Sequence, residues 1–422
     1  MGVKQPDRTV LIVGGGIIGL CCALRLQQAG YATTIVDPGD FNLSASRGNA
    51  GHIAIEQIEP LASRAAIRST VGRFALGRGS LSLPLRDIGE WAPFAWKLIR
   101  AANPSQFEAG KVILRCLLAK AISGWRRLAL DIAAPDLLLE RGHVIVWQDA
   151  RRAARDIAAW QRTDTGTARS HPARPAERAV MAKALGVELA AALIFENTGQ
   201  VADLDRLFRM LGAAWRAGGG RMIKVTVRRM TIAEGLAKLT LDDGREIVPE
   251  TILLTAGVAS GRLLGDLGRP VPLIAERGYH IQSEHHDWPA DMPPVVFQER
   301  SIIITRFEAG LRVAGFVEFG RPDSPPDARK WARLQRHATE LSLPLHAPLT
   351  RWMGARPTLP DYIPAIGRAS FARNLVYAFG HQHLGVTLAP VTADIVCHIV
   401  DGSADPQSIA SLSLERFAAT KT

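Results

Sequence analysis

The order of hydrophobic and polar positions predicts a strand, a helix and a second strand at the start of the chain. Residues 9–14 form a continuous apolar run, which is typical of a parallel strand covered on both faces. Residues 17–29 have the character of a helix that ends at Gly30, a residue that commonly follows the last helical turn. Residues 32–37 are a second strand that ends in Asp37. This order predicts a βαβ unit.

The rest of the chain contains both helical and strand patterns. Further helices are expected over residues 86–132, 204–217, 326–341 and 386–400, and residues 149–192 also carry Ala and Arg on helical spacing. Further strands are expected over residues 142–147, 222–227 and 251–255, and the chain is β-rich from 268 to 345. Residues 377–380 come with a turn before the last helix. A hairpin is expected to join residues 237–241 to 245–248 across Asp242-Asp243-Gly244. Nucleotide-type α/β elements therefore lie near both ends of the chain, with mixed structure between them.

The length and composition favour a soluble enzyme of two domains. A chain of 422 residues is too long for one simple core, and its 47% hydrophobic and 22% charged residues are ordinary for a globular protein. The net charge is +11, which could favour nucleic acid, an anionic membrane or small anions. The Arg residues are scattered in short pairs, without a long basic run, so no nucleic-acid partner is expected. The four cysteines lack metal-site spacing, and we expect free thiols, a reducing compartment and no metal: Cys21, Cys22, Cys116 and Cys397.

The apolar run near the N-terminus also resembles the core of a signal peptide. Three clustered glycines interrupt it, however, and Arg25 follows before the run reaches the roughly 20 apolar residues that a membrane span needs. We therefore expect no signal peptide, and no other segment is interpreted as a membrane span. The expected location is cytoplasmic, with peripheral contact at the inner face of the membrane left open.

The turn between the first strand and helix carries the first chemical motif, Gly14-x-Gly16-x-x-Gly19. The first glycine permits the tight turn, the second lets the backbone approach a pyrophosphate, and the third lets helix and strand pack closely. The helix N-terminus supplies free N–H groups to the phosphates. Asp37 follows 18 residues after Gly19, where its carboxylate can accept bonds from a ribose. Strand, glycines, helix and acid in this register predict dinucleotide binding.

Four later segments indicate which dinucleotide is bound. Residues 46–51 match S-x-x-N-A-G, residues 255–260 contain A-G-x-x-S, residues 354–367 follow G-x-R-P-x-x-P-D-x-x-P-x-I-G, and residues 380–387 match G-H-x-x-x-G-x-T. These segments resemble the D-amino-acid oxidase/dehydrogenase superfamily of FAD proteins, in the same order along nearly the whole chain. Among its branches the chain is most similar to bacterial D-amino-acid dehydrogenases, including those that act on cis-4-hydroxy-D-proline. It departs from the family pattern at Asp37, where Glu is commoner, and at Ala355, where Leu is commoner.

The resemblance implies an α/β fold in which a discontinuous Rossmann-type FAD-binding domain joins a mixed α+β substrate domain of the D-amino-acid oxidase type. The expected boundaries are 1–85, 200–267 and 346–422 for the FAD-binding domain, and 86–199 and 268–345 for the substrate domain. It also implies the residues that hold FAD: Gly14, Gly16, Ile17, Ile18, Gly19, Asp37, Ser46, Asn49, Ala50, Gly51, His52, Val225, Ala256, Gly257, Gly380, His381, Leu384, Gly385, Val386 and Thr387.

Four residues are expected to serve the substrate. Arg356 aligns with the family arginine that holds the substrate carboxylate, and a planar guanidinium suits this task through two parallel hydrogen bonds. Tyr279 follows Arg277-Gly278 in a segment that leads to the substrate region; its hydroxyl would touch a carboxylate or cap the pocket, or else it is a packed strand residue. His52 and His383, with His381 beside them, lie by motif around the flavin. His383 is expected to tune specificity, although a buried histidine with satisfied hydrogen bonds is the alternative for each.

The implied activity is oxidation of a D-amino acid, for example cis-4-hydroxy-D-proline or D-proline, by hydride transfer from Cα to flavin N5. The imine product would give a 2-oxo acid. Alternatives are oxidation of glycine, sarcosine or another secondary amine, a tRNA-modifying flavoprotein, and a non-catalytic subunit with vestigial FAD. The electron acceptor stays open between a quinone, an electron-transfer protein and oxygen, and partner subunits are also left open.

Overall fold

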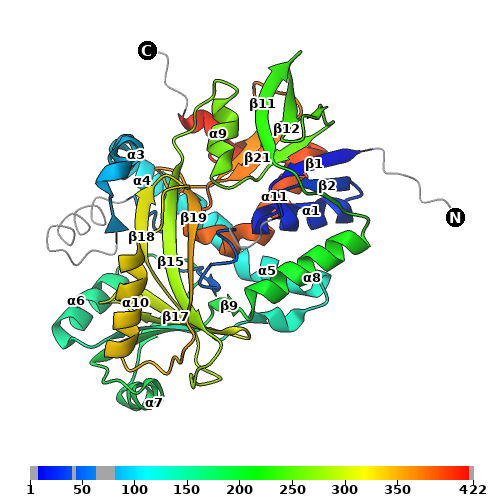
Figure 1. The fold of residues 1–422 in the computed structure, drawn as a ribbon. Helices are drawn as coiled ribbons and strands as arrows, with labels where there is room; N and C mark the ends of the chain where they lie inside the picture. The colour runs from blue at the N-terminus through cyan, green and yellow to red at the C-terminus, as the bar shows by residue number, and fades with distance from the viewer. Residues whose placement is uncertain (1–7, 40–43, 63–80, 418–422) are drawn as a thin grey trace.

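The computed structural model describes residues 8–39, 44–62 and 81–417. A six-stranded sheet with the order β10-β2-β1-β14-β21-β20 contains the predicted βαβ unit (Figure 1). Its strands run in parallel except for β20, which is antiparallel to β21. The strands are β1 (Thr9–Val13), β2 (Ala32–Val36), β10 (Arg221–Ile223), β14 (Ile252–Leu254), β20 (Ala365–Arg368) and β21 (Leu375–Phe379). Strands from both ends of the chain therefore meet in one sheet, as the sequence pattern predicted.

Three helices cover one face of this sheet: α1 (Ile17–Gln28), α8 (Leu204–Ala217) and α11 (Gly385–Asp401). Helix α1 packs against both α8 and α11, and the thiols of Cys21 and Cys22 are buried in this core. Residues Gln382–Asp401 are long and apolar enough to cross a membrane, which corrects the expectation that no such segment exists. In this fold 67% of that window is buried inside the protein, so α11 serves as a core helix.

The other side of the six-stranded sheet meets a smaller three-stranded sheet, β11 (Val227–Ala233), β12 (Leu236–Leu241) and β13 (Glu246–Ile247). Its buried side chains join one hydrophobic cluster with the six-stranded sheet and with α9 (Ala259–Gly265). The hairpin predicted around Asp242-Asp243-Gly244 joins β12 to β13. The single strand predicted over 222–227 is instead two strands, β10 and β11, which belong to different sheets.

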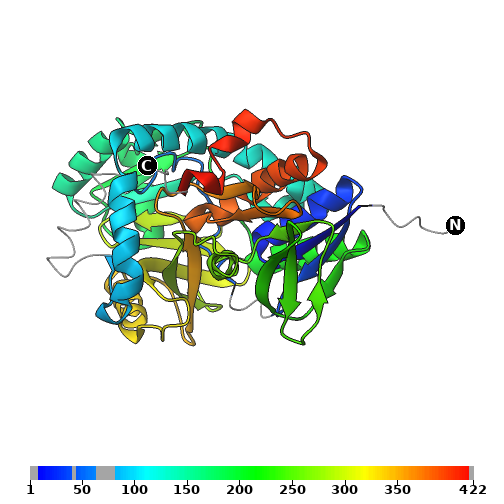
Figure 2. The ribbon, with the colours of Figure 1, turned by 90° about the horizontal axis from the view of Figure 1, so that it is seen from above.

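A nine-stranded sheet forms the second half of the molecule, beside the six-stranded sheet (Figure 2). Its order is β19-β15-β18-β17-β16-β6-β8-β7, and β4 also pairs with β18. The strands are β4 (Leu81–Ser82), β6 (His143–Trp147), β7 (Ser170–Pro172), β8 (Ala191–Phe195), β15 (Ile274–Ser283), β16 (Val295–Phe297), β17 (Ile302–Phe307), β18 (Gly310–Gly320) and β19 (Thr350–Thr358). Most neighbours are antiparallel, and β6–β16 and β18–β4 are parallel.

Further helices and a small fourth sheet complete the described structure. The helices are α3 (Ile88–Ala101), α4 (Pro104–Leu118), α5 (Ala121–Asp131), α6 (Ala150–Trp160), α7 (Pro175–Leu185) and α10 (Ala328–Glu340), and the short α12 (Pro406–Ala410) lies near the C-terminus. Asp or Asn side chains cap several of the helices in the chain, as with Asp149 at α6 and Asp327 at α10, where the carboxylate accepts a bond from the first turn. The small sheet has the order β3-β9-β5, with β3 (His52–Ile53), β9 (Gly199–Val201) and β5 (Leu138–Leu139).

Strand β19 is the main element that the sequence pattern did not predict. Its residues lie within 346–422, the range expected in the FAD-binding domain, yet β19 pairs with β15 along nine residues of the nine-stranded sheet. The strand mixes Arg, Trp, Met and Gly, so it lacks the alternating apolar signal that marks a half-buried strand. This strand brings a segment from late in the chain to the junction between the two halves.

Candidate active site

The glycine turn has the geometry that its motif requires. Gly14 has a φ of +104°, and a Cβ there would lie 2.6 Å from the carbonyl oxygen of Thr255. A Cβ on Gly19 would lie 2.0 Å from the carbonyl oxygen of Gly14, so α1 packs directly on the turn. The Thr255 hydroxyl donates to the Gly14 carbonyl at 2.9 Å and fixes the turn to β14. The Gly16 N-cap of α1 has no side-chain hydrogen bond, and the first turn has no acidic residue, which leaves its N–H groups free for an anion.

Asp37 lies at the end of β2, as predicted, and its carboxylate orders the turn. Oδ2 accepts a hydrogen bond from the Gly15 N–H at 2.7 Å, and Oδ1 accepts one from the Gly39 N–H at 2.8 Å. Each carboxylate oxygen can accept a second bond, so both can still bind a ribose hydroxyl.

A cavity of about 330 Å³ opens beside this turn between the two halves. It is lined by the following residues from the predicted FAD set: Gly14, Gly16, Ile17, Ile18, Asp37, Ser46, Asn49, Val225, Ala256, Gly257, His381, Gly385 and Val386. Sequence reasoning did not single out Arg262 or Gln382, which also line it. Three features together fit a dinucleotide with a pyrophosphate: the free N–H groups of α1, the close approach to the backbone that the glycines permit, and the carboxylate of Asp37.

The other members of the predicted FAD set do not line this cavity in the described structure. They are Gly19, Ala50, Gly51, His52, Gly380, Leu384 and Thr387. Some shape the surroundings: Gly51 has a φ of +73° and lies against Phe307, and the Thr387 hydroxyl accepts a bond from the Ala54 N–H at 3.1 Å. Ala50 and His52 line a second cavity instead. Direct contact of these seven residues with FAD stays a prediction.

The second cavity, also about 330 Å³, lies against the nine-stranded sheet. Aliphatic and aromatic side chains form much of its wall, and polar groups come from the loop after Ala50 and from Gln298 and Ser301. Among the residues that the structure describes, Arg356 is the one that lines both cavities. The predicted carboxylate ligand therefore lies where the dinucleotide cavity and the second cavity meet.

Two neighbours on β15 hold the Arg356 side chain. Its Nη1 lies 3.3 Å from Oε1 of the buried Glu276, whose Oε2 accepts a bond from the Thr358 hydroxyl at 3.0 Å. Gly278 lies directly under the guanidinium, because a Cβ there would be 2.6 Å from Nη2. A guanidinium has five N–H donors, so the contact with Glu276 leaves donors for a substrate carboxylate. The orientation of Arg356 thus depends on Glu276 and on the absence of a side chain at Gly278.

Tyr279 lies on the opposite face of β15 and lines neither cavity. Successive side chains of a strand point to opposite faces, so Tyr279 points away from the side that carries Glu276 and Gly278. Its hydroxyl contacts Glu318 at 3.3 Å and accepts a bond from the Asp327 N–H at 3.1 Å, and its ring packs edge to face on Trp331. The geometry corresponds to the packed strand tyrosine that the sequence left as an alternative to a substrate contact.

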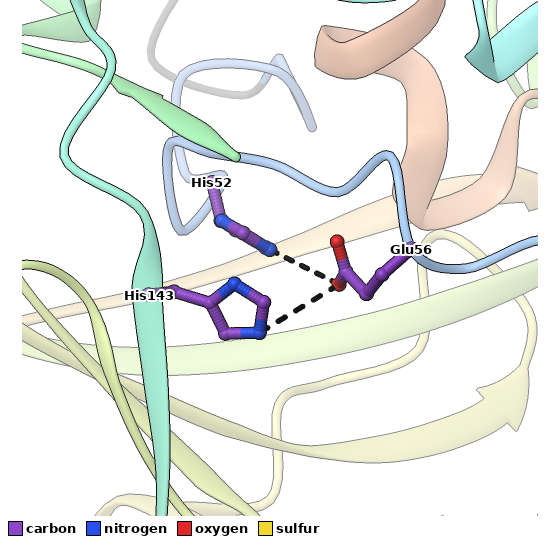
Figure 3. Close-up of side chains that lie close together, drawn as sticks. All are labelled: His52, Glu56 and His143. Carbon is purple, nitrogen blue, oxygen red and sulfur yellow. Dashed lines mark hydrogen bonds and ion pairs between the residues drawn. The ribbon is translucent and has the colours of Figure 1, made fainter. Parts of the chain in front are cut away.

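A cluster of His52, Glu56 and His143 lines the second cavity (Figure 3). Glu56 Oε1 lies 3.1 Å from Nε2 of His52 and 4.0 Å from Nε2 of His143. Burial raises the pKa of Glu56, but its interactions with His52 and His143 and its hydrogen bonds outweigh burial and lower the pKa to about 2. The three side chains offer ligand atoms within 4.8 Å of one another, so they could also hold a metal ion. The expectation that the protein holds no metal was based on the spacing of the cysteines alone. This cluster of two histidines and one glutamate was not part of it.

Strand alternation places His143 in the cluster. On β6, Val144 and Val146 pack into the hydrophobic cluster under α10, and His143 and Ile145 face the cavity. Neither His143 nor Glu56 was predicted as a site residue. The four-residue spacing of His52 and Glu56 was visible in the sequence, but His143 comes from a strand 87 residues later, which no local pattern could bring beside them.

The other two histidines of the motif differ in their surroundings. Nε2 of His381 lies 2.9 Å from the Thr392 hydroxyl, and burial lowers its pKa to about 3, so it is a neutral, packed residue at the cavity wall. Burial lowers the pKa of His383 to about 4, and the charges of Glu276, Arg356 and Glu56 act on it as well. His383 therefore lies within the electrostatic influence of both Arg356 and the Glu56 cluster. Its role in specificity stays a prediction.

Replacing Asp37 with Ala is expected to weaken FAD binding roughly 10- to 100-fold, the range for loss of hydrogen bonds to a charged group. The variant loses the acceptor for the ribose and the bonds that order the Gly15 and Gly39 N–H groups. The measurement is a fluorescence titration of the apoprotein with FAD. Asp37→Glu should retain most of the affinity, and Asp243→Ala, at an exposed ion pair with Arg245, is the matched control. Unchanged affinity in Asp37→Ala would remove Asp37 from the site.

Comparisons with known proteins cover nearly the whole chain. The profile of the DAO family, described as FAD dependent oxidoreductase, matches residues 9–399. A D-amino-acid oxidase of Bradyrhizobium diazoefficiens is 25% identical over 418 residues, which cover 97% of this chain and 99% of the relative. A D-amino acid dehydrogenase of Paramagnetospirillum magneticum is 28% identical over 425 residues, with 97% and 98% covered. The crystal structure of glycine oxidase from Geobacillus kaustophilus has a TM-score of 0.70 at 19% identity, with 97% and 99% covered, and this likeness supports the fold.

Proposed function

This chain belongs to the DAO family of FAD-dependent oxidoreductases, and from that premise we propose that it oxidises D-amino acids, with cis-4-hydroxy-D-proline and D-proline as candidates. The broader activity, FAD-dependent oxidation of an amino acid, follows from the family and from the full-length similarity to D-amino-acid oxidases and dehydrogenases. The D configuration is supported by the names of those relatives. The observation that carries the proposal is the position of Arg356 at the junction of the two cavities.

Arg356 supplies the contact that orients an amino acid. Its guanidinium can bind the substrate carboxylate through two parallel hydrogen bonds, which fixes both the position and the direction of the adjacent Cα. Glu276 and Gly278 hold the guanidinium in one orientation before the substrate arrives. A group held in this way loses little conformational entropy on binding, so more of the binding free energy is available for positioning.

Part of the wall of the second cavity is apolar. Ile145, Val296 and Ile303 provide apolar surface in the cavity that Arg356 lines, and an apolar wall strengthens the contact between a carboxylate and a guanidinium. When bound, FAD supplies the redox chemistry by accepting a hydride from the substrate Cα. The chain itself contributes orientation, an ionic anchor and a partly apolar cavity. Loss of a proton from the substrate amine makes Cα a better hydride donor.

A second candidate is oxidation of glycine, sarcosine or another secondary amine. The glycine oxidase structure shares the fold, but identity of 19% does not extend the activity to this chain. These substrates also carry a carboxylate for Arg356, and they differ from larger D-amino acids in how much of the second cavity they would fill. The tRNA-modifying and non-catalytic alternatives stay predictions, each without a structural observation that favours it.

The proposal is tested by dye-linked turnover of the purified holoenzyme. The panel contains D-amino acids with their L enantiomers, D-proline, both 4-hydroxyprolines, glycine and sarcosine, with an artificial electron acceptor so that the natural acceptor need not be known. We expect turnover with D-amino acids and little with their L enantiomers. Turnover restricted to L-amino acids would contradict the stereochemical assignment, and turnover restricted to glycine or sarcosine would support the second candidate.

A further inference from the structure

One oxygen of the Glu56 carboxylate has a partner and the other has none. Oε1 contacts Nε2 of His52 at 3.1 Å, whereas Oε2 is buried without a hydrogen-bond partner among the described residues. The Glu56 side chain is 2% exposed and lines the cavity that contains Arg356. A buried carboxylate oxygen without a partner is costly, because its lost hydration is not replaced. A hydrogen-bond donor on the substrate would supply the missing contact.

His143 offers a donor beside that oxygen. Its Nδ1 lies 2.9 Å from the Thr198 hydroxyl, and its Nε2 is the ring nitrogen nearer to the Glu56 carboxylate. The negative Glu56 favours the tautomer with the proton on Nε2, with the Thr198 hydroxyl donating to Nδ1. The 4.0 Å between Nε2 and Glu56 Oε1 is too long for a direct hydrogen bond. The cavity wall therefore presents an unused acceptor and an unused donor side by side.

His52 contacts the other oxygen of this carboxylate. Its Nδ1 lies 3.2 Å from the Gly199 carbonyl oxygen, and its Nε2 lies 3.1 Å from Glu56 Oε1. Oε1 is therefore already in contact with a side chain, and Oε2 is the oxygen that can accept from a further donor.

A hydroxyl group matches this arrangement better than the other substituents of amino acids. It has one O–H donor for Glu56 Oε2 and lone pairs that can accept from His143 Nε2. An ammonium group has donors only and would face the His143 N–H unfavourably, and a methylene group would leave both protein groups without partners.

We propose that Glu56 and His143 form a subsite for a hydroxyl group on the side chain or ring of the substrate, so that the enzyme selects hydroxylated amino acids. This inference rests on the proposed function, since it places the substrate carboxylate on Arg356 in the same cavity. In this arrangement Glu56 and His143, which were not predicted as site residues, select among amino acids. Arg356 binds the carboxylate that all amino acids share.

The test compares kcat/KM for cis-4-hydroxy-D-proline and D-proline, because the two differ by one hydroxyl. We expect the holoenzyme to prefer the hydroxylated substrate roughly 10- to 100-fold, the range for one hydrogen bond to a charged group. Glu56→Gln and His143→Phe, which keep the approximate shapes, should bring the ratio of the two kcat/KM values close to 1. His143→Phe also keeps the stacking on Phe195. Kd values from perturbation of the flavin spectrum by unreactive hydroxylated and unhydroxylated carboxylates give a readout independent of turnover.

The control is Glu196→Gln, a half-exposed carboxylate on the same sheet region, which should keep the preference of the unchanged enzyme. Absence of turnover with every amino acid would contradict the proposed function itself. Turnover without any preference for the hydroxyl, or a preference that survives in both Glu56→Gln and His143→Phe, would overturn only the subsite.

A metal ion is the competing occupant of this cluster, because two histidines and one carboxylate are common ligands of zinc. Calorimetric titration of the EDTA-treated holoenzyme with Zn²⁺ distinguishes a metal site from a hydroxyl subsite. Tight one-to-one binding that Glu56→Gln and His143→Phe abolish would overturn the hydroxyl subsite, and absence of such binding supports it.

Discussion

Replacing Arg356 with Ala is expected to lower kcat/KM for the preferred amino acid roughly 10²- to 10³-fold, the range for truncating one partner of a buried charge pair. Most of the loss should appear in KM, because Arg356 binds a carboxylate that is present in both the ground state and the transition state. FAD should stay bound, since Arg356 is one of many residues that line the dinucleotide cavity. The measurement is steady-state kinetics together with the flavin content and the unfolding temperature of the variant.

Two further variants define what this result means. Arg351→Ala removes an exposed arginine from the same strand and should leave kcat/KM unchanged. Arg356→Lys keeps the charge but loses the fork that binds a carboxylate through two bonds, so an intermediate loss is expected. Because Arg356 also pairs with the buried Glu276, a lower unfolding temperature in Arg356→Ala would indicate a structural contribution. A normal KM in a folded, yellow Arg356→Ala would remove Arg356 from the substrate site.

Replacing Gly14 with Ala is expected to abolish stable FAD binding. The residue has a φ of +104°, and the added Cβ would lie 2.6 Å from the backbone carbonyl of Thr255, which cannot move as a side chain could. Strain from such a conformation costs on the order of 1–3 kcal/mol, before the clash with the backbone is added. The turn would shift away from the N-terminus of α1, which offers the free N–H groups to the pyrophosphate.

The measurement is the flavin-to-protein ratio after purification, with circular dichroism to verify the fold. Gly89→Ala is the matched control, because a Cβ at this position in α3 meets nothing within 4 Å and its φ is not positive. It should retain full flavin and equal or slightly higher stability. A Gly14→Ala protein with a full complement of FAD would show that the turn is not the cofactor site.

The dinucleotide site was the part of the structure that local patterns could predict. The strand, the three glycines, the helix and Asp37 are close in sequence, so one stretch of 29 residues, from Thr9 to Asp37, contains the whole signal. Arg356 was found differently, through its place in a family motif. The structure then placed it between the two cavities on β19, a strand that its own residues did not predict.

The substrate side could be predicted only in part, because it depends on which side of a strand each residue faces. Tyr279 and Gly278 are neighbours, yet only Gly278 lies beneath Arg356, because successive strand residues point in opposite directions. His143 and Glu56 come together through the nine-stranded sheet and the loop after Ala50, which are distant in sequence. No pattern within either segment carries that information, so the cluster becomes visible only in the folded chain.

The central claim is that this chain oxidises D-amino acids with its FAD, and anaerobic mixing of the holoenzyme with one D-amino acid and, separately, its L enantiomer tests it most directly. Without oxygen or another acceptor, a substrate that transfers its hydride leaves the flavin reduced and colourless, so the natural electron acceptor does not enter the result. We predict that the D enantiomers of the preferred amino acids bleach the flavin and that their L enantiomers do not. Bleaching by L-amino acids alone, or by no amino acid at all, would contradict the account.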